Sequence, residues 1–255
     1  MKNSKDALRM ARQLFRLSFV EGKLNDERIR TYLATLIHVH QQFTFHEAIH
    51  VDSEIEMTGT VERVRERGGS FFVTFAATGT AGDEMVLESR STFLMSDQAA
   101  AESPADRIEP PVDVCGPNEL PGPVRAPVVG ELLSMRKSVS RSGLVRYAAV
   151  TRDFNPLHWD HATARSAGLD GVVVHGLLIL AWMAQQCATY SSESSPIAMI
   201  KARFRSAIAP AAPVVVESAV RDMAVDARDI QVTVRVVAED ADVVTGSAIV
   251  RVEGV

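Results

Sequence analysis

The hydrophobic pattern changes period along the chain. Residues 5–20 and 26–38 repeat apolar side chains at helical spacing, and Asn25 followed by Asp26 and Glu27 is typical of a helix start. After these two predicted helices, apolar and polar positions alternate, which predicts an antiparallel meander of four strands. The predicted strands cover 42–51, 54–67, 70–79 and 84–95, and the segments "RGGS" and "TAGDE" connect the last three as hairpin turns.

A proline-rich segment follows the meander and divides the chain. Residues 97–127 hold seven of the eleven prolines, which continue neither a strand ladder nor a helix, so this segment is predicted to be a linker. Helical and alternating patterns then return in the same order as before. The second half is predicted to contain a strand at 132–139, helices at 142–150 and 175–190, and strands at 196–208, 212–223, 229–239 and 242–253.

The helix at 175–190 indicates how each half is built. Its sequence, "HGLLILAWMAQQCATY", has little polar face, so we expect a sheet to wrap around it and bury it on nearly all sides. The repeated order of helix and strands suggests two such units in one chain. The predicted fold class is α+β, with each half an antiparallel sheet wrapped around a long central helix.

Composition narrows the class of protein. A chain of 255 residues with 46% hydrophobic residues can bury one large core or two small ones. The net charge of -5 gives no reason to expect nucleic acid, and no apolar run reaches the roughly 18 to 20 residues that span a bilayer. The two cysteines, Cys115 and Cys187, suggest neither a disulfide framework nor a zinc knuckle, so we expect a reduced, cytoplasmic location.

Candidate chemistry is concentrated in "VTRDFNPLHWDHATARSAG", residues 150–168. Asp153, Asn155 and His158 are spaced so that a turn stiffened by Pro156 can aim a carboxylate and an imidazole into one pocket. Their ordinary pKa values, about 3.9 and about 6.5, provide an acid and a base near neutral pH, and the pair could hold and activate one water. The spacing alone is more typical of an ordinary polar turn, with His158 packing beside Trp159.

The longer context carries a family resemblance. The segment "YAAVTRDFNPLHWDHATARSAGLDGVVVHGLLILAWMAQ" resembles the hydratase 2 motif of MaoC-like enoyl-CoA hydratases and (R)-3-hydroxyacyl dehydratases. This resemblance implies a double hotdog fold, with Asp153 and His158 binding the catalytic water and Asn155 orienting the loop. It also implies that the backbone N–H of Gly176, at the start of the central helix, holds the thioester oxygen. His175 is interpreted as a packing or capping residue without a role in proton transfer.

The resemblance also implies domain boundaries, and the sequence departs from the family pattern in two places. The N-terminal part, 38–96, resembles a degenerate hotdog without a copy of the motif, and 128–255 resembles the catalytic one, so one active site per chain is expected. Residues 1–37 do not match; this atypical helical start is weakly similar to the opening helices of an ATP synthase delta subunit. The other departure is Arg152, where a glycine is usual.

The implied reaction is the reversible hydration of trans-2-enoyl thioesters to (R)-3-hydroxyacyl thioesters, a carbon–oxygen lyase activity that needs no metal or redox cofactor. The acyl group would be carried by coenzyme A or an acyl carrier protein, and Arg203 or Arg205 could contact the carrier phosphates or form a solvated strand edge. An acyl-CoA thioesterase and a non-catalytic acyl-thioester binding module remain alternatives. Both a monomer and a homodimer of double hotdogs remain open.

Four histidines lie close together around the start of the predicted sheet. His38, His40, His46 and His50 lie within thirteen residues, but no acidic or cysteine partner stands at a recurrent ligand spacing. We therefore expect a solvated or packed polar face there, and no metal site.

Overall fold

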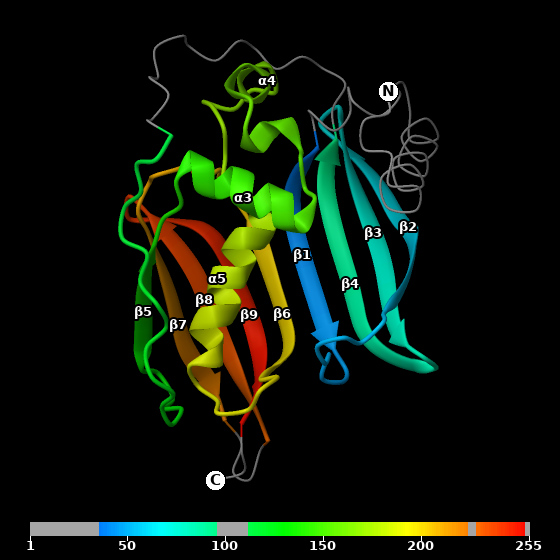
Figure 1. Cartoon of the computed structure of the whole chain (residues 1–255), viewed down its shortest axis with the longest axis vertical. Helices are drawn as coiled ribbons and strands as arrows, with labels where there is room; N and C mark the ends of the chain where they lie inside the picture. Colours follow the sequence, from blue (N-terminus) through cyan, green and yellow to red (C-terminus); the bar gives the residue numbers. More distant parts are fainter. Residues whose placement is uncertain (1–35, 96–111, 224–227, 253–255) are drawn as a thin grey trace.

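The structure is a computed structural model that describes residues 36–95, 112–223 and 228–252. Its first half contributes four antiparallel strands, and its second half contributes five strands, two α-helices before the central helix, and that helix itself (Figure 1). The first-half strands are β1 (Ile37–Phe45), β2 (Glu56–Arg67), β3 (Ser70–Ala81) and β4 (Glu84–Met95). The second half contains β5 (Leu132–Lys137), α3 (Arg141–Thr151), the short 3-10 helix η2 (Pro156–His158), α4 (His161–Ser166), α5 (Gly176–Ala188), β6 (Ile197–Phe204), β7 (Val214–Asp222), β8 (Asp229–Ala238) and β9 (Ala241–Arg251).

The nine strands of the described residues belong to one sheet, with the order β2-β3-β4-β1-β6-β9-β8-β7-β5. The two halves join through antiparallel pairing of β1 with β6, with Gln41 opposite Ala202 in the middle of the shared ladder. The four meander strands of each half lie side by side in the same spatial order, β1-β4-β3-β2 in the first half and β6-β9-β8-β7 in the second. The repeat that the hydrophobic pattern predicts is therefore visible in the strand order.

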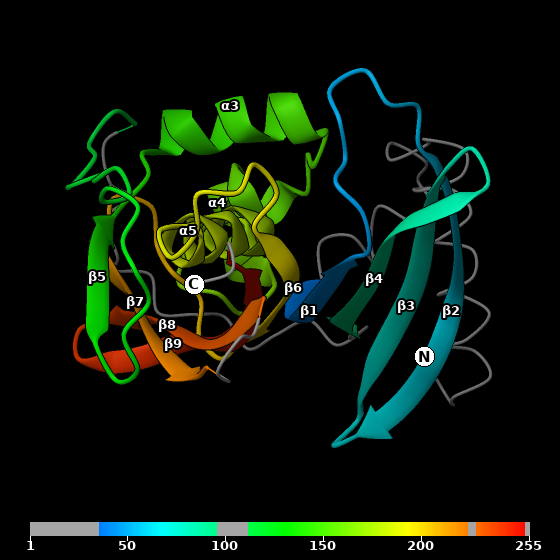
Figure 2. The same ribbon diagram turned by 90° about the horizontal axis from the view of Figure 1, so that it is seen from below.

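The central helix of the second half is α5, and the sheet curves around it (Figure 2). It contacts every strand from β5 to β9. Its buried side chains include Ile179, Leu180, Trp182, Met183 and Cys187, which explains why the sequence of this helix lacks a polar face. The α+β class is that expected from the sequence, and the second half has the predicted antiparallel sheet around a long apolar helix. Residues 36–95 of the first half contain only strands and loops, and the helices predicted before them lie almost entirely outside the described residues.

The start of the first half differs in detail from the prediction. Strand β1 begins at Ile37, so the helix predicted over 26–38 does not include its last two positions, and β1 ends at Phe45 instead of residue 51. The stretch "IHVHQQF" alternates like a strand, whereas the polar residues after Phe45 form bends and turns. Residue 36 is not helical either, and the other positions of both predicted N-terminal helices lie outside the described residues.

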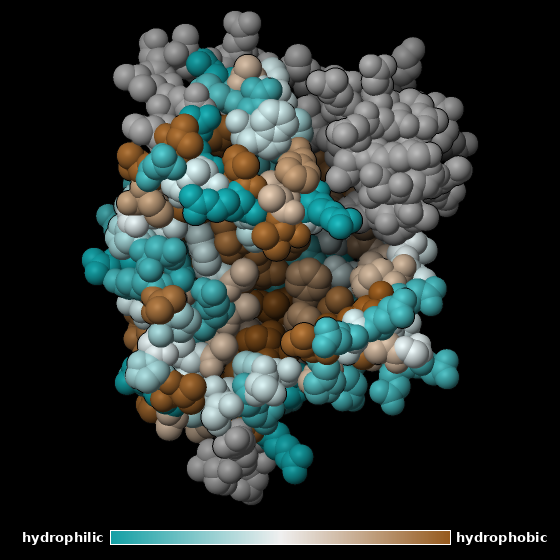
Figure 3. All heavy atoms as spheres, viewed as in Figure 1, coloured by the Kyte–Doolittle hydropathy of each residue, from teal (hydrophilic) through white to brown (hydrophobic). Residues whose placement is uncertain are grey.

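The molecular surface is hollowed between α5 and the first-half strands, and apolar side chains line the hollow (Figure 3). The two halves meet where β1 pairs with β6. Phe43 of β1 and Phe204 of β6 pack there against the core of the second half. No helix in the described part of the chain is both long and apolar enough to cross a membrane.

Candidate active site

The segment between α3 and α5 is held by side-chain caps. Helix α3 begins at its N-cap Ser140, and Asn155 caps η2 by accepting a hydrogen bond from the N–H of Leu157 at 3.2 Å. Asp153 Oδ1 in turn accepts a bond from the N–H of Asn155 at 3.3 Å. The polar residues of this loop therefore support its backbone path, and Asn155 takes part in two of these hydrogen bonds.

Arg152 is the C-cap of α3 and has a left-handed backbone, with φ 61° and ψ 19°. A side chain with a Cβ is disfavoured there, whereas glycine is not. This geometry explains why glycine suits the position. The chain keeps the loop conformation with Arg152 in place, at the cost of local backbone strain.

Replacing Arg152 by glycine is expected to stabilise the protein by about 0.5–1 kcal/mol, because the strain disappears and the exposed side chain contributes little packing. Chemical denaturation of the two proteins would measure the difference. Arg146→Gly is the matched control: Arg146 is exposed in the interior of α3, where glycine costs about 1 kcal/mol. A loss of stability in Arg152→Gly would show that the arginine side chain stabilises the loop.

His158 lies at the end of η2 with its ring orientation fixed by one hydrogen bond. Its Nδ1 is 2.8 Å from the carbonyl oxygen of Val173. A carbonyl only accepts, so Nδ1 carries the proton and Nε2 is left with a lone pair. Burial lowers the pKa of His158, although the nearby Asp153 carboxylate opposes this effect. The ring is therefore neutral near pH 7, with Nε2 available as a base.

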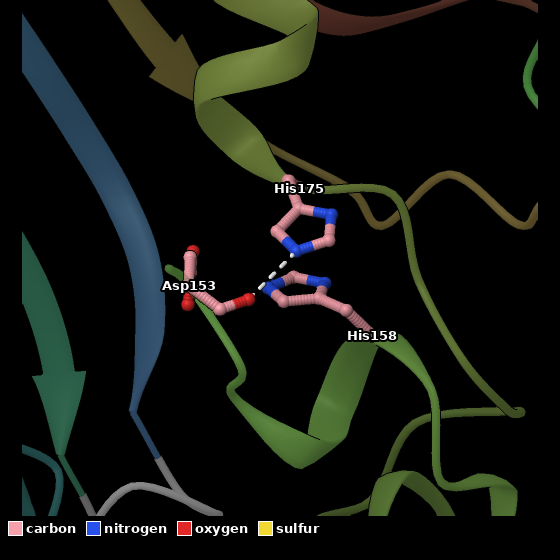
Figure 4. A group of neighbouring side chains, drawn as sticks. All are labelled: Asp153, His158 and His175. Atoms are coloured by element: carbon pink, nitrogen blue, oxygen red, sulfur yellow. Dashed lines mark hydrogen bonds between the residues drawn. The ribbon is translucent and has the colours of Figure 1, made fainter. Parts of the chain in front are cut away.

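His175, interpreted from the sequence as a packing or capping residue, lies inside the same cluster (Figure 4). It makes no side-chain capping bond to α5. Instead, its Nε2–H donates to the backbone carbonyl of Asp153 at 3.2 Å, and its ring stacks on His158 with the ring centroids 3.7 Å apart. It is 1% exposed, and burial, followed by the neighbouring His158, lowers its pKa to about 4. His175 thus holds both the Asp153 backbone and the plane of the His158 ring.

The Asp153 carboxylate lies close to the side chains of His158 and His175. Asp153, His158 and His175 each place one polar side-chain atom within 4.8 Å of the others. The negative charge also acts on Tyr147, whose pKa is raised to about 12 by burial and then by Asp153. Asp153 itself is only partly buried. The sequence spacing predicted the pairing of Asp153 with His158, but gave no signal for His175 beyond its position before Gly176.

Asp153, His158 and His175 are close enough together to be considered as metal ligands. The rings of His158 and His175 are stacked at an interplanar angle of 23°, so their nitrogens lie in two nearly parallel planes instead of surrounding one point. One nitrogen of each ring is also bonded to a backbone carbonyl: His158 Nδ1 to Val173, and His175 Nε2 to Asp153. The four first-half histidines do not converge either: His46 bonds to Glu88, and Nε2 of His38 bonds to the carbonyl of His40.

Gly176 is the first residue of α5, beside this cluster. The carbonyl of His175 accepts hydrogen bonds from Leu178 and Ile179, whereas the N–H of Gly176 has no acceptor among the described residues. A Cβ on Gly176 would lie 3.2 Å from both Nδ1 of His38 and Cζ of Phe204, so glycine permits the close approach of the first half. The free N–H and the positive end of the helix dipole together suit a developing negative charge.

Arg203 and Arg205 lie away from the cluster. Arg203 pairs with His40 and Thr245 across the sheet, and it alternates with Ala202 and Phe204, which face α5. Arg205 bonds through Nε to Thr245 Oγ1 at 3.2 Å. Both arginines are therefore on the sheet face opposite α5, and the structure does not bring them to Asp153 and His158.

Comparison with known proteins points to one family of domains. Residues 128–241 match the family model described as "MaoC like domain". A 51-residue stretch is 41% identical to the mitochondrial 3-hydroxyacyl-[acyl-carrier-protein] dehydratase of Arabidopsis thaliana. That match covers 20% of this chain and 31% of the relative, so it spans about a third of the relative's length.

Solved structures agree on the fold. A MaoC-like dehydratase superposes with a TM-score of 0.73 at 20% identity, covering 98% of this chain and 83% of the other. A MaoC-like dehydratase from Phytophthora capsici superposes with a TM-score of 0.62 at 16% identity, covering 87% of this chain and 73% of the other. The complete arrangement of both halves is therefore the fold of MaoC-like dehydratases, as the sequence resemblance implies.

Proposed function

We propose that this protein catalyses the reversible hydration of trans-2-enoyl thioesters to (R)-3-hydroxyacyl thioesters. The supporting observation is the convergence of the Asp153 carboxylate and the neutral His158 Nε2 beside the free N–H of Gly176. An acid–base pair next to a helix N-terminus suits a reaction that moves one proton while negative charge develops on a thioester oxygen. The relative from Arabidopsis thaliana is named as a dehydratase of this chemistry.

In the proposed mechanism, Asp153 and His158 hold one water molecule. The water oxygen bonds to C3 while the pair takes one proton from the water and returns one to C2, so the double bond becomes a single bond and the pair ends as it began. The thioester oxygen accepts a hydrogen bond from Gly176 N–H as charge builds on it. Asn155 holds the loop, and His175 holds the Asp153 backbone and the His158 ring. Dehydration is the same sequence in reverse.

The apolar hollow between α5 and the first-half strands is the proposed place for the acyl chain (Figure 3). Its apolar lining would favour burial of methylene groups, each contributing about 0.8 kcal/mol. The 38–96 segment would therefore serve as a substrate-lining half, and 128–255 as the catalytic half. Coenzyme A and an acyl carrier protein both remain candidate carriers. Arg203 and Arg205 lie away from the catalytic cluster and would not contact either carrier there.

The proposal predicts that the purified protein removes the conjugated thioester absorbance of crotonyl-CoA or a longer enoyl-CoA. Substrates of increasing chain length should be tested, because the hollow sets the acceptable length. Free thiol should be measured in parallel: release of coenzyme A without loss of conjugation would indicate a thioesterase instead. Thermal stabilisation by these compounds with no turnover at any chain length would indicate a binding module and contradict the proposed function.

A further inference from the structure

His38 brings a polar atom from the first half to the catalytic cluster. It lies in β1, and its ring stacks on Phe93 with the centroids 4.5 Å apart and tilts against Phe204 at 5.0 Å. Phe204 belongs to the second half, so His38 occupies the junction of the two halves beside the start of α5. This aromatic setting places an imidazole where an apolar ring would also pack.

One hydrogen bond determines the tautomer of His38. Its Nε2 lies 3.1 Å from the backbone carbonyl of His40, and since a carbonyl only accepts, Nε2 carries the proton. Nδ1 is therefore left with a lone pair. Burial lowers the pKa of His38 to about 4, while the His40 carbonyl, the Gln41 side chain and Asp153 oppose this shift. The ring is neutral near pH 7, and Nδ1 is an acceptor.

The acceptor atom faces the site. Nδ1 of His38 lies 3.2 Å from the position that a Cβ on Gly176 would occupy, so this nitrogen packs closely against the first residue of α5. His38 is also close enough to Asp153 for the carboxylate to influence its titration. Figure 4 shows the Asp153 side chain on the side of the cluster toward β1. The lone pair therefore borders the place where the thioester would rest.

We propose that His38 is a substrate-binding residue contributed by the first half, whose Nδ1 accepts a hydrogen bond from a donor of the bound acyl thioester. This inference rests on the proposed function. A neutral imidazole nitrogen beside the start of α5 can accept a hydrogen bond, whereas a phenylalanine ring would fill the same stack without an acceptor. Two groups of the substrate can donate: the 3-hydroxyl of the hydroxyacyl form and the first amide N–H of the pantetheine arm.

Three variants separate hydrogen bonding from packing. His38→Phe keeps an aromatic ring between Phe93 and Phe204 and removes both nitrogens. His38→Asn loses the stack but can place an amide oxygen near the position of Nδ1. His50→Phe is the control, because His50 is exposed in the turn after β1. Thermal unfolding of each variant would show whether it is folded before kinetics are compared.

We expect His38→Phe to raise KM roughly 10-fold, as expected for loss of one hydrogen bond of about 1.4 kcal/mol, while the melting temperature stays near that of the wild type. His38→Asn should recover part of this loss although it packs less well, and His50→Phe should match the wild type. The opposite order, with His38→Phe fully active and His38→Asn impaired, would show that the ring serves packing alone and would overturn the inference.

Substrate variation identifies the donor. If the donor is the 3-hydroxyl, His38→Phe raises KM for 3-hydroxybutyryl-CoA and leaves KM for crotonyl-CoA unchanged. If the donor is the amide, KM rises for both compounds and for crotonyl-N-acetylcysteamine, but not for the ethyl thioester, which lacks an amide. Turnover by the wild type tests the proposed function separately: an active wild type with an unaffected His38→Phe variant would overturn only the role of His38.

Discussion

Replacing Asp153 by asparagine is expected to lower kcat of enoyl-thioester hydration by roughly 10²–10⁴-fold, the usual contribution of a positioned acid–base group. Asparagine has nearly the same shape, and its amide oxygen can still accept the bond from the N–H of Asn155. The backbone carbonyl that binds His175 is unchanged. The substitution therefore removes the negative charge and the proton-transfer capacity, while the loop keeps its supports.

The measurement is a steady-state assay with enoyl-CoA, combined with thermal unfolding. Asp222→Asn is the matched control, because Asp222 is exposed at the end of β7 and the same chemical change there should leave kcat unaltered. A variant of Asp153 with wild-type kcat for every chain length would contradict its role in the proposed mechanism. A large drop in melting temperature would instead show that the carboxylate mainly stabilises the loop.

Local patterns in the sequence predict much of this architecture. The strand runs of the second half and the central helix follow from period-two alternation and from the apolar sequence of 175–190, because burial on one or all sides constrains residue type directly. The turn around Asn155 follows from its side-chain capping and from Pro156. These features depend on neighbours close in sequence, so they can be predicted from one sequence.

The parts that the sequence does not reveal depend on contacts between distant segments. His175 and Asp153 are 22 positions apart, and nothing in the spacing shows that an imidazole at the start of α5 bonds to the loop carbonyl. His38 is still farther from Gly176, and the two meet only because β1 pairs with β6 at the junction of the halves. The strand alternation around Ala202 places Arg203 on the sheet face away from α5, and its contact with a carrier phosphate stays a prediction.

His158 offers the second large effect, and its two ring nitrogens can be tested separately. His158→Asn can place an amide N–H near the position of Nδ1 and keep the bond to the Val173 carbonyl, but it removes Nε2. We expect kcat to fall by roughly 10²–10⁴-fold, because the base that takes the proton from water is lost. His158→Gln, which can place a polar atom near Nε2 but loses the support from Val173, should not restore activity, since an amide does not accept a proton near neutral pH.

The pH dependence of the wild type provides an independent check on His158. Burial lowers the pKa of this imidazole, so the neutral form persists below the usual histidine range near 6.5 and is lost only at more acidic pH. The kcat/KM of the wild type should therefore be level around pH 7 and fall on the acid side, below pH 6.5. Tyr147, with its pKa raised to about 12, should not impose an alkaline limit below pH 10. A wild-type profile that falls as pH rises through 7 would require a protonated His158, and would reverse the direction of proton transfer between the water and this ring.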